Sequence, residues 1–516
     1  MKACATQENI VEKFPVGNLF LPIPDTDFCA FLDEIDELVK MAPEIIEAIE
    51  ADLKIYAQKK KKLRLEDKKF FESQTGDFPK LDIKERNLLA RELKMAVGRP
   101  RMSAYSVYVF LMIRGFLGSL TSKPARRFLR ESISLYGFLQ SRGWRMPRAT
   151  TILENVNLVS HATRELIFDK QIQMVLHEKT DDFKKLTIDS TSVKANTCWP
   201  TDAKILTGLL MRANSFGQRM HVFGLKDFKQ GWCPRRLMEM DKLEFQICLT
   251  AGKPRSRGKL KKHYRQLLKR GRKVSSCLDE ELKRFKQSVS METLAPSRRA
   301  FLQRVIQQIE TDISDSNKVI KYADDWVFKG KSLPSTEKVL SLSDGSAAYI
   351  KKGSRIPVIG YKPQLVRSEK GFVASLIVPQ GNAADSVKLA PTISEAIKRT
   401  GITAELVSTD DGYASREGRE KVLAMGVNDI SISGAKGRKL TDEADWESEE
   451  YRDARRNRSA VESLMFTIKH GFEFGELGRR GLDAVRAELT EKVLAYNCCR
   501  MILMKKRRRE AFDKAA

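Results

Sequence analysis

Apolar residues recur at helical spacing near the start of the chain. Between Phe28 and Val39 they fall three or four positions apart, and a second run with the same period covers Ile45 to Ile55. This spacing places apolar side chains on one face of a helix. We therefore expect residues 1–97 to form a helical N-terminal region.

The next stretch, residues 98–180, combines apolar helices with short basic segments. It opens with Gly98-Arg-Pro-Arg101, continues into the apolar run Tyr105–Leu120, and then mixes basic and apolar positions over Lys123–Arg130. Helices joined by short basic turns are typical of a helix-turn-helix module, and an ordinary helical bundle is the alternative. We predict a helical DNA-binding module here.

From Leu186 the pattern changes to alternation with β-branched residues, which is typical of a strand. We predict strands at Leu186–Val193, Ala347–Ile350, Val358–Val366, Gly371–Val378, Ala404–Ser408 and Asn428–Ser433, and helices at Ser386–Arg399, Arg416–Met425 and Asp453–His470. This order predicts an α/β domain over residues 181–500, with a mixed sheet of RNase H-like topology. A helical insertion over about 196–345 interrupts it after the first strand.

The charge of the chain favours a polyanionic partner over a generic basic protein. Its 516 residues include 93 Lys and Arg but only 67 Asp and Glu, a net charge of +26. Eleven of the basic residues fall between Lys253 and Lys273, where no acidic residue occurs, and phosphate contact explains such a segment better than a solvated helix face. The predicted DNA contacts here are Lys253, Arg255, Arg257, Lys259, Lys261, Lys262 and Arg265. A second basic run, Lys505–Arg509, lies in a predicted C-terminal tail over 501–516.

The sequence disfavours a disulfide-stabilised protein, a zinc protein, a secreted or membrane protein and a P-loop nucleotide-binding protein. The eight cysteines include no CxxC pair, and no histidine pairs with a cysteine at zinc spacing. The first residues lack the pattern of a signal peptide, and no apolar stretch approaches the roughly 18 residues of a membrane span. No glycine-rich phosphate loop of the GxxxxGK[ST] type occurs. We expect a cytoplasmic protein without membrane contact.

Three carboxylates occupy positions suited to metal chemistry. Asp189 lies inside the first strand, Asp410 follows the strand Ala404–Ser408, and Glu462 lies in the last predicted helix. An aspartate inside an apolar strand is costly to bury unless it is paired or binds a metal. Hard oxygen ligands suit Mg²⁺ or Mn²⁺, and phosphodiester chemistry uses two such ions.

The last predicted helix places cations beside its carboxylate. Arg458, Glu462 and Lys469 share one face by their spacing, and Val461, Leu464 and Ile468 form an adjacent apolar face. This arrangement suits a metal site that also binds phosphate, and an ordinary salt bridge on the helix surface is the alternative.

Four blocks of the sequence resemble, in the correct order, bacterial insertion-sequence transposases of the DDE class, of the ISNCY-like group. Thr187–Asn196 followed by Trp199–Asp202 resembles the first-aspartate block. Thr409–Tyr413 resembles the second-aspartate block, and Arg458-x3-Glu462-x6-Lys469 has the spacing of the glutamate signature. The middle block corresponds to Ser343–Gly353, Ile359–Lys362 and Val378–Asp385.

The sequence departs from the family pattern at two positions. Arg455 stands where the glutamate signature usually has a tyrosine, and arginine is itself able to contact phosphate. Asp411 stands where the second-aspartate block usually has a basic residue, so both Asp410 and Asp411 are candidates for the ligand. We favour Asp410.

The resemblance implies a DNA transposase that binds the terminal inverted repeats of its mobile element, cleaves DNA strands and transfers them to target DNA. It implies Asp189, Asp410 and Glu462 as catalytic metal ligands for two Mg²⁺ ions, replaceable by Mn²⁺, and Arg458, Lys469 and Arg455 as DNA contacts. It further implies a homodimer or larger assembly on double-stranded DNA, in the bacterial cytoplasm at the nucleoid. The alternatives are an inactive DNA-binding descendant, a metal-dependent nuclease on the same fold, and an RNA-binding structural protein.

Overall fold

The computed structural model describes residues 26–75, 102–197, 201–220, 233–351 and 356–515. Tertiary contacts divide the chain into two compact units. The first takes its described residues from Met1–Lys54, Arg101–Asn196 and Ser346–Ala516, and the second from Ile55–Pro100 and Thr197–Gly345. Predictions for residues 1–25 and 76–101, and for Trp199 and Gly353, lie outside the described residues.

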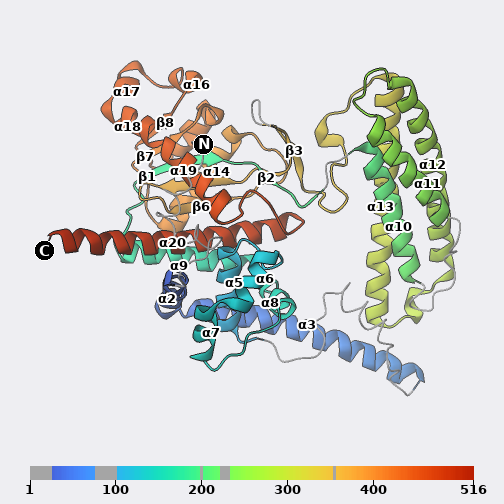
Figure 1. Ribbon diagram of the computed structural model, residues 1–516, viewed down its shortest axis with the longest axis horizontal. Coiled ribbons are helices and arrows are strands. Elements are labelled where there is room, and N and C mark those ends of the chain that lie inside the picture. The colour runs from blue at the N-terminus through green and yellow to red at the C-terminus, as the bar shows by residue number, and fades with distance from the viewer. Residues whose placement is uncertain (1–25, 76–101, 198–200, 221–232, 352–355, 516) are drawn as a thin grey trace. The chain divides into compact units, whose positions relative to one another are not determined.

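The first unit is built around a mixed five-stranded sheet (Figure 1). Its strands lie in the order β6 (Val373–Ile377), β5 (Gln364–Ser368), β1 (Lys185–Ser190), β7 (Leu406–Thr409) and β8 (Asp429–Ile432). β5 is antiparallel to β1 and β6, whereas β1, β7 and β8 run parallel. The predicted α/β domain with a mixed sheet is confirmed, and β1 is its central strand.

One predicted strand is in fact two, and its division shapes the site. The expected strand Val358–Val366 is wrong, because the chain forms β4 (Val358–Tyr361), leaves strand geometry at Lys362 and Pro363, and resumes as β5. Proline has no amide hydrogen for a strand ladder and favours such a break. β4 pairs with β2 (Val193–Lys194) and β3 (Ala348–Ile350) in a separate three-stranded sheet.

Two of the predicted helices in this domain agree closely with the structure, as α14 (Asp385–Thr400) and α15 (Arg416–Leu423). The predicted helix Asp453–His470 is instead two helices, α18 (Glu449–Asn457) and α19 (Ser459–Gly471), which meet at Arg458. Two short helices, α16 (Ala435–Arg438) and α17 (Glu443–Glu447), precede them.

Helices from both ends of the chain complete the first unit. They are α2 (Thr26–Met41), α5 (Ala104–Phe116), α6 (Lys123–Glu131), α7 (Ile133–Gln140), α8 (Ala149–Val156), α9 (His161–His177) and α20 (Leu482–Ala515). α5 is buried along nearly its whole length, and it packs with α2 and α9 against α20 (Figure 1). α6 instead exposes Lys123, Arg126, Arg127 and Arg130.

A buried carboxylate joins three parts of this helical layer. Glu491 on α20 accepts from Nε of Arg114 on α5 at 2.7 Å, and from Nε of Arg164 on α9 at 2.7 Å. Arg479 lies 3.5 Å from the same carboxylate. Burial alone would raise the pKa of Glu491, but the three arginines outweigh it and lower the pKa from 4.5 to about 2.

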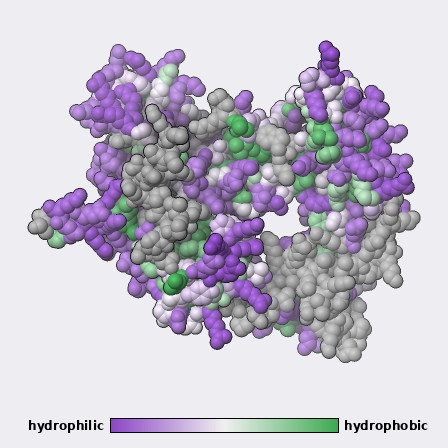
Figure 2. All heavy atoms as spheres, viewed as in Figure 1, coloured by the Kyte–Doolittle hydropathy of each residue, from purple (hydrophilic) through white to green (hydrophobic). Residues whose placement is uncertain are grey.

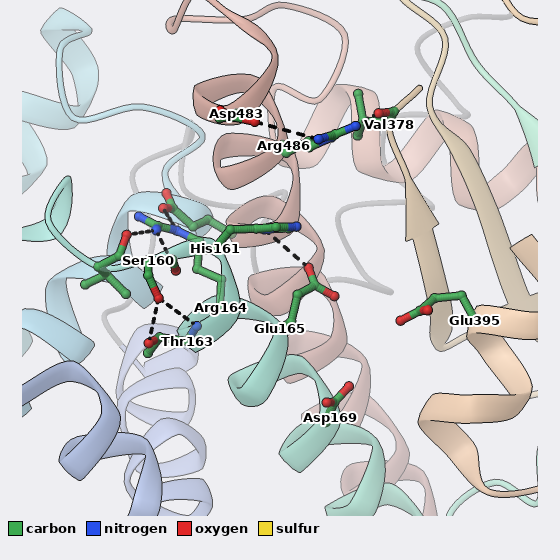
Figure 3. Close-up of polar contacts among 12 residues, drawn as sticks. Ser160, His161, Thr163, Arg164, Glu165, Asp169, Val378, Glu395, Asp483 and Arg486 are labelled. Atoms are coloured by element: carbon green, nitrogen blue, oxygen red, sulfur yellow. Dashed lines mark hydrogen bonds and ion pairs between the residues drawn. The ribbon is translucent and has the colours of Figure 1, made fainter. Parts of the chain in front are cut away.

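A second buried cation ties α9 to α14. The guanidinium of Arg399 on α14 pairs with Glu165 and Asp169 on α9 and with Glu395 on its own helix. Figure 3 shows Glu165 and Asp169 on α9 on the side of Glu395. α14, which covers the sheet strands β5 and β6, is therefore fixed to the helical layer by charge as well as by packing.

The predicted C-terminal tail, residues 501–516, is helical as far as Ala515, as the end of α20. Lys505 pairs with Glu34, Glu37 and Glu178, and Arg508 donates to the carbonyl of Lys179 at 2.7 Å. The helix beyond Lys505 is exposed, and Figure 2 shows hydrophilic residues along this end. Lys505 and Arg508 are therefore already engaged within the molecule.

The second unit contains the predicted helical insertion. Its long helices are α10 (Asp202–Met220), α11 (Cys233–Thr250), α12 (Arg257–Ser288) and α13 (Pro296–Lys329), and they enclose their own apolar core. The helix α3 (Glu44–Thr75) begins in the first unit and contributes its residues from Ile55 onward to the second. There Asp67 accepts from the backbone amide of Ser297 at 2.9 Å and so caps the first turn of α13.

None of the described helices combines the length and the hydropathy that crossing a membrane requires.

The buried carboxylate yields a test of stability. Glu491→Gln removes one charge from among three arginines, and we expect a loss of about 3 kcal/mol in the free energy of unfolding at pH 7. Urea denaturation measures this loss. The wild-type contribution is complete above pH 4.5 and is lost as the pH falls through about 2, so the two proteins should converge in acid.

The matched control is Glu476→Gln in the same unit. Glu476 pairs with Lys194 at 3.6 Å, but its side chain is 79% exposed, so its removal should hardly move the denaturation midpoint. Equal losses in the two variants would contradict the role assigned to Glu491.

Candidate active site

Two of the predicted carboxylates lie on neighbouring parallel strands. Asp189 is the fifth residue of β1, and Asp410 directly follows the last residue of β7. The register pairs Thr187 with Ser408, and Asp189 and Asp410 each lie two residues further along the chain from that pair. The charges of both aspartates act on the Tyr413 side chain. Both side chains are half-buried.

Local hydrogen bonds orient both carboxylates. Asp189 Oδ1 accepts from the Ser190 amide at 2.6 Å. Asp410 Oδ1 accepts from the Gly412 amide at 3.0 Å and so caps the short 3₁₀ turn Asp411–Tyr413. Within the described residues, no lysine or arginine forms an ion pair with Asp410.

Asp411 has a different role from its neighbour. Its Oδ1 accepts from the backbone amides of Lys436 and Gly437, at 2.8 and 3.0 Å, and so anchors the first turn of α16. Gly434 permits this approach, because a Cβ there would lie 2.7 Å from the Cβ of Asp411. These contacts favour Asp410 over Asp411 as the metal ligand.

The Tyr413 hydroxyl lies among the carboxylates. Its side chain is fully buried, and its pKa is raised first by burial and then by the charges of Asp385, Asp189 and Asp410. The hydroxyl donates to Oε1 of Gln364, a fully buried residue at the start of β5. Tyr413 thus connects β5 with the turn that follows β7.

Asp385 and its partners are site residues that the sequence pattern did not indicate. Asp385 opens α14, accepts from Gln364 Nε2 at 3.0 Å and pairs with Lys362 Nζ at 2.8 Å. Asp385 Oδ2 and Asp410 Oδ1 lie 3.5 and 3.1 Å from the position that a Cβ on Gly412 would take. Asp385 and Lys362 each end a segment of the middle block, but that pattern alone gave neither of them a role.

The third predicted ligand, Glu462, is not brought to the aspartates. It lies in the first turn of α19, which packs against β1 and buries Val461, Leu464 and Ile468. Its side chain is 68% exposed, and its Oε1 lies 3.3 Å from Nη2 of Arg458. Among the described residues, Asp189, Asp410 and Glu462 do not form a cluster of ligand atoms within 4.8 Å of one another.

Such a cluster does occur elsewhere in the first unit, where Glu34, Glu37 and Glu178 come together. These are the three carboxylates that pair with Lys505, so a lysine already supplies the positive charge there.

The predicted phosphate contacts near Glu462 differ in their surroundings. Arg455 stacks over the Trp446 ring at 4.3 Å and donates to the Trp446 carbonyl at 3.0 Å, so it is held within the α17–α18 segment. Lys469 is half-buried, with its aliphatic chain near Gly475. Arg458, at the junction of α18 and α19, remains close to Glu462.

The predicted basic segment spans the turn before α12 and the first turns of that helix. Lys253, Arg255, Arg257, Lys259, Lys262 and Arg265 are exposed, and Lys261 is half-buried. Apolar residues of the same helix, including Leu267 and Leu268, are buried in the core of the second unit. The cations therefore line the outer side of this bundle.

The donor set at the strand ends fits a divalent cation. Asp189 and Asp410 supply hard oxygen ligands, and both are half-buried beside a third carboxylate, Asp385, whose charge Lys362 balances. Glu462 could join them if it exchanged Arg458 for the cation.

A side pocket of the first unit lies apart from these residues. It is lined by residues of α9, β6, α14 and α20, among them His161, Glu165 and Arg486, and Figure 3 shows its surroundings. Arg486 closes one side by donating to the Val378 carbonyl at 3.2 Å. The pocket includes none of the predicted site residues.

The different roles of Asp410 and Asp411 can be tested by stability. Asp411→Ala removes two hydrogen bonds to a carboxylate, so we expect a loss of about 2 kcal/mol in the free energy of unfolding. Asp410→Ala removes one capping hydrogen bond but also a negative charge close to Asp385, so its loss in the free energy of unfolding should be smaller than that of Asp411→Ala. Urea denaturation compares them, and a larger loss for Asp410→Ala would contradict the assignment.

Comparison with known proteins supports the same region. Residues 334–498 match the family model described as "Transposase DDE domain". No curated protein and no solved structure matches the chain. The matched stretch contains β3–β8, Asp410 and Glu462, whereas β1 with Asp189 precedes it in sequence and completes its sheet. The C-terminal region of this chain therefore carries a transposase DDE domain, which implies an RNase H-like fold and phosphoryl transfer on DNA.

Proposed function

We propose that the protein is a DNA transposase of the bacterial insertion-sequence type, similar to the ISNCY group, that cuts DNA at the ends of its own element and joins those ends to target DNA. The observation that carries the proposal is the pair Asp189 and Asp410. Asp189 lies near the end of β1 and Asp410 directly after β7, two parallel neighbouring strands, and Asp410 falls within the match to the transposase DDE domain. Ligands in open α/β sheets bind at this end of the strands.

The residues that would hold Mg²⁺ or Mn²⁺ are Asp189, Asp410 and Glu462. A pair of such ions supplies an activated oxygen nucleophile and stabilises the leaving oxygen of the phosphodiester. To hold a cation, Glu462 would turn away from Arg458, and that guanidinium would then be free to contact a DNA phosphate. Lys469 contacts phosphate from the same helix, and Arg455 supports α18 from its stack on Trp446.

The exposed cations of α12 bind the DNA backbone in this proposal, from Lys253 to Arg265 along the second unit. The exposed cations of α6 are a further backbone contact within the helical module over 98–180, which binds the element ends. Because two ends are processed together, the active form is a homodimer or a larger assembly on DNA.

The metal ligands are tested by strand cleavage of a duplex that carries an element end, with Mg²⁺. Asp189→Ala, Asp410→Ala and Glu462→Ala should each lower the cleavage rate by more than about 100-fold. Replacing a residue that is hydrogen-bonded to a metal ligand already lowers activity by about 10- to 100-fold, and replacing the ligand itself should lower it further. Asp483→Ala is the control, since its side chain is 96% exposed. Unchanged cleavage in any of the three would overturn that residue's assignment.

The same assay separates the proposed function from its rivals. Joined products with target DNA identify a transposase, whereas cleavage without joining identifies a nuclease. Tight binding of the ends without any cleavage identifies an inactive DNA-binding relative.

The proposed DNA contact of the exposed cations from Lys253 to Arg265 is tested by the salt dependence of binding. In the double variant Lys259→Gln/Lys262→Gln, the slope of log K against log salt should fall by about 0.9 for each phosphate that the variant no longer neutralises, and affinity should fall with it. Fluorescence anisotropy on duplex DNA measures both quantities.

The control changes the same net charge on the same helix. Lys283→Gln/Lys286→Gln removes two cations that already pair with Asp279 and Glu310. Equal changes of slope in the two double variants would contradict a DNA contact at the start of α12.

A further inference from the structure

An ion pair with little exposure lies beside the two aspartates. Lys362, in the break between β4 and β5, and Asp385, at the start of α14, are joined at 2.8 Å, with side chains only 10% and 14% exposed. The sequence blocks that contain them give no reason for a lysine this close to a predicted cation site. The Lys362 ammonium would compete with a metal ion for the carboxylates of Asp189 and Asp410.

Several contacts fix the position of the Asp385 carboxylate. Lys362 pairs with Oδ2, Gln364 Nε2 donates to Oδ1 at 3.0 Å, and the first turn of α14 presents its positive end. These contacts use both oxygens of Asp385, so the carboxylate is committed to its neighbours rather than directed at a ligand.

The same contacts extend to the aspartates themselves. Gln364 Oε1 accepts from the Tyr413 hydroxyl, and that hydroxyl lies in the field of Asp189, Asp410 and Asp385. Asp385 and Asp410 also both lie near Gly412, in the 3₁₀ turn Asp411–Tyr413. Asp385 Oδ2 and Asp410 Oδ1 are each within 3.5 Å of the position that a Cβ on Gly412 would take. Asp385 Oδ2 thus contacts the Lys362 ammonium and also lies close to the turn that carries Asp410.

We propose that Asp385 is a positioning residue, which neutralises Lys362 and holds it away from Asp189 and Asp410 so that these two carboxylates are available to a divalent cation. This inference rests on the proposed function for the identity of the cation site. Without the Asp385 charge, Lys362 pairs with Asp410 and occupies the place of the metal.

The test uses the full-length protein and three variants, Asp385→Asn, Lys362→Gln and the double variant. Asp385→Asn should weaken Mn²⁺ binding to the DNA-free protein at least tenfold, and should raise the Mg²⁺ concentration for half-maximal cleavage by a similar factor. Lys362→Gln should bind Mn²⁺ at least as tightly as wild type. The double variant lacks the competing Lys362 ammonium, and its Mn²⁺ affinity should be within about threefold of that of wild type.

Mn²⁺ binding is measured by electron paramagnetic resonance, which does not depend on catalysis. The matched control is Glu405→Gln, because Glu405 pairs with Lys184 at 2.6 Å at the opposite ends of the same two strands. It removes one negative charge from the same sheet and should leave Mn²⁺ binding unchanged. Urea denaturation of every variant identifies any loss that follows from unfolding.

Two outcomes overturn the inference. One is wild-type Mn²⁺ affinity in a folded Asp385→Asn variant. The other is a loss of Mn²⁺ affinity in Asp385→Asn that persists in the double variant with Lys362→Gln, because Asp385 would then affect the metal without acting through Lys362. If wild type binds Mn²⁺ but cleaves no DNA, the proposed function fails while the positioning role is still measured by the binding experiment.

Discussion

The position of β1 at the centre of the sheet is the constraint on which the rest of the first unit depends. β1 pairs with β5 on one side and with β7 on the other, so it joins the antiparallel half of the sheet to the parallel half. The parallel pair sets Thr187 opposite Ser408, two residues before Asp189 and Asp410, and the antiparallel pair sets Gln364 opposite Ser190. One strand thus sets the positions of both aspartates and of the hydrogen-bonded side chains around them.

Much of this fold follows from local pattern. The alternation after Leu186, the amphipathic period over Ser386–Arg399 and the apolar face of α19 all appear in the structure close to their predicted places. The division of the strand at Lys362 and Pro363 was missed, although proline gives a local reason for it. The break at Arg458 was also missed, because both α18 and α19 have helical sequences and no proline or glycine marks their junction.

The candidate site was only partly predictable, and the reason is physical. Asp189 and Asp410 stand out as candidates in the sequence because a charged residue inside an apolar strand is costly to bury and the end of a strand is a common ligand position. Lys362 and Asp385 compensate each other, so neither one is unusual alone, and their pairing depends on where β5 and α14 lie in space. Arg455 illustrates the opposite case, since its stack on Trp446 gives it a structural contact that its place in the motif does not indicate.

The five-stranded sheet and the buried Glu491 both join residues that are far apart in the sequence, and this affects the order in which the chain folds. Among the strands of that sheet β1 is synthesised first, and its two partner strands follow only after the whole of Thr197–Gly345 has been made. The inserted helices possess their own apolar core, whereas the open edges of β1 are exposed until β5 and β7 arrive. Arg114 and Arg164 also precede their carboxylate by hundreds of residues along the chain. The sheet and its helical layer are therefore completed only after the C-terminal residues have been synthesised, and β1 lacks both partner strands until β5 has been made.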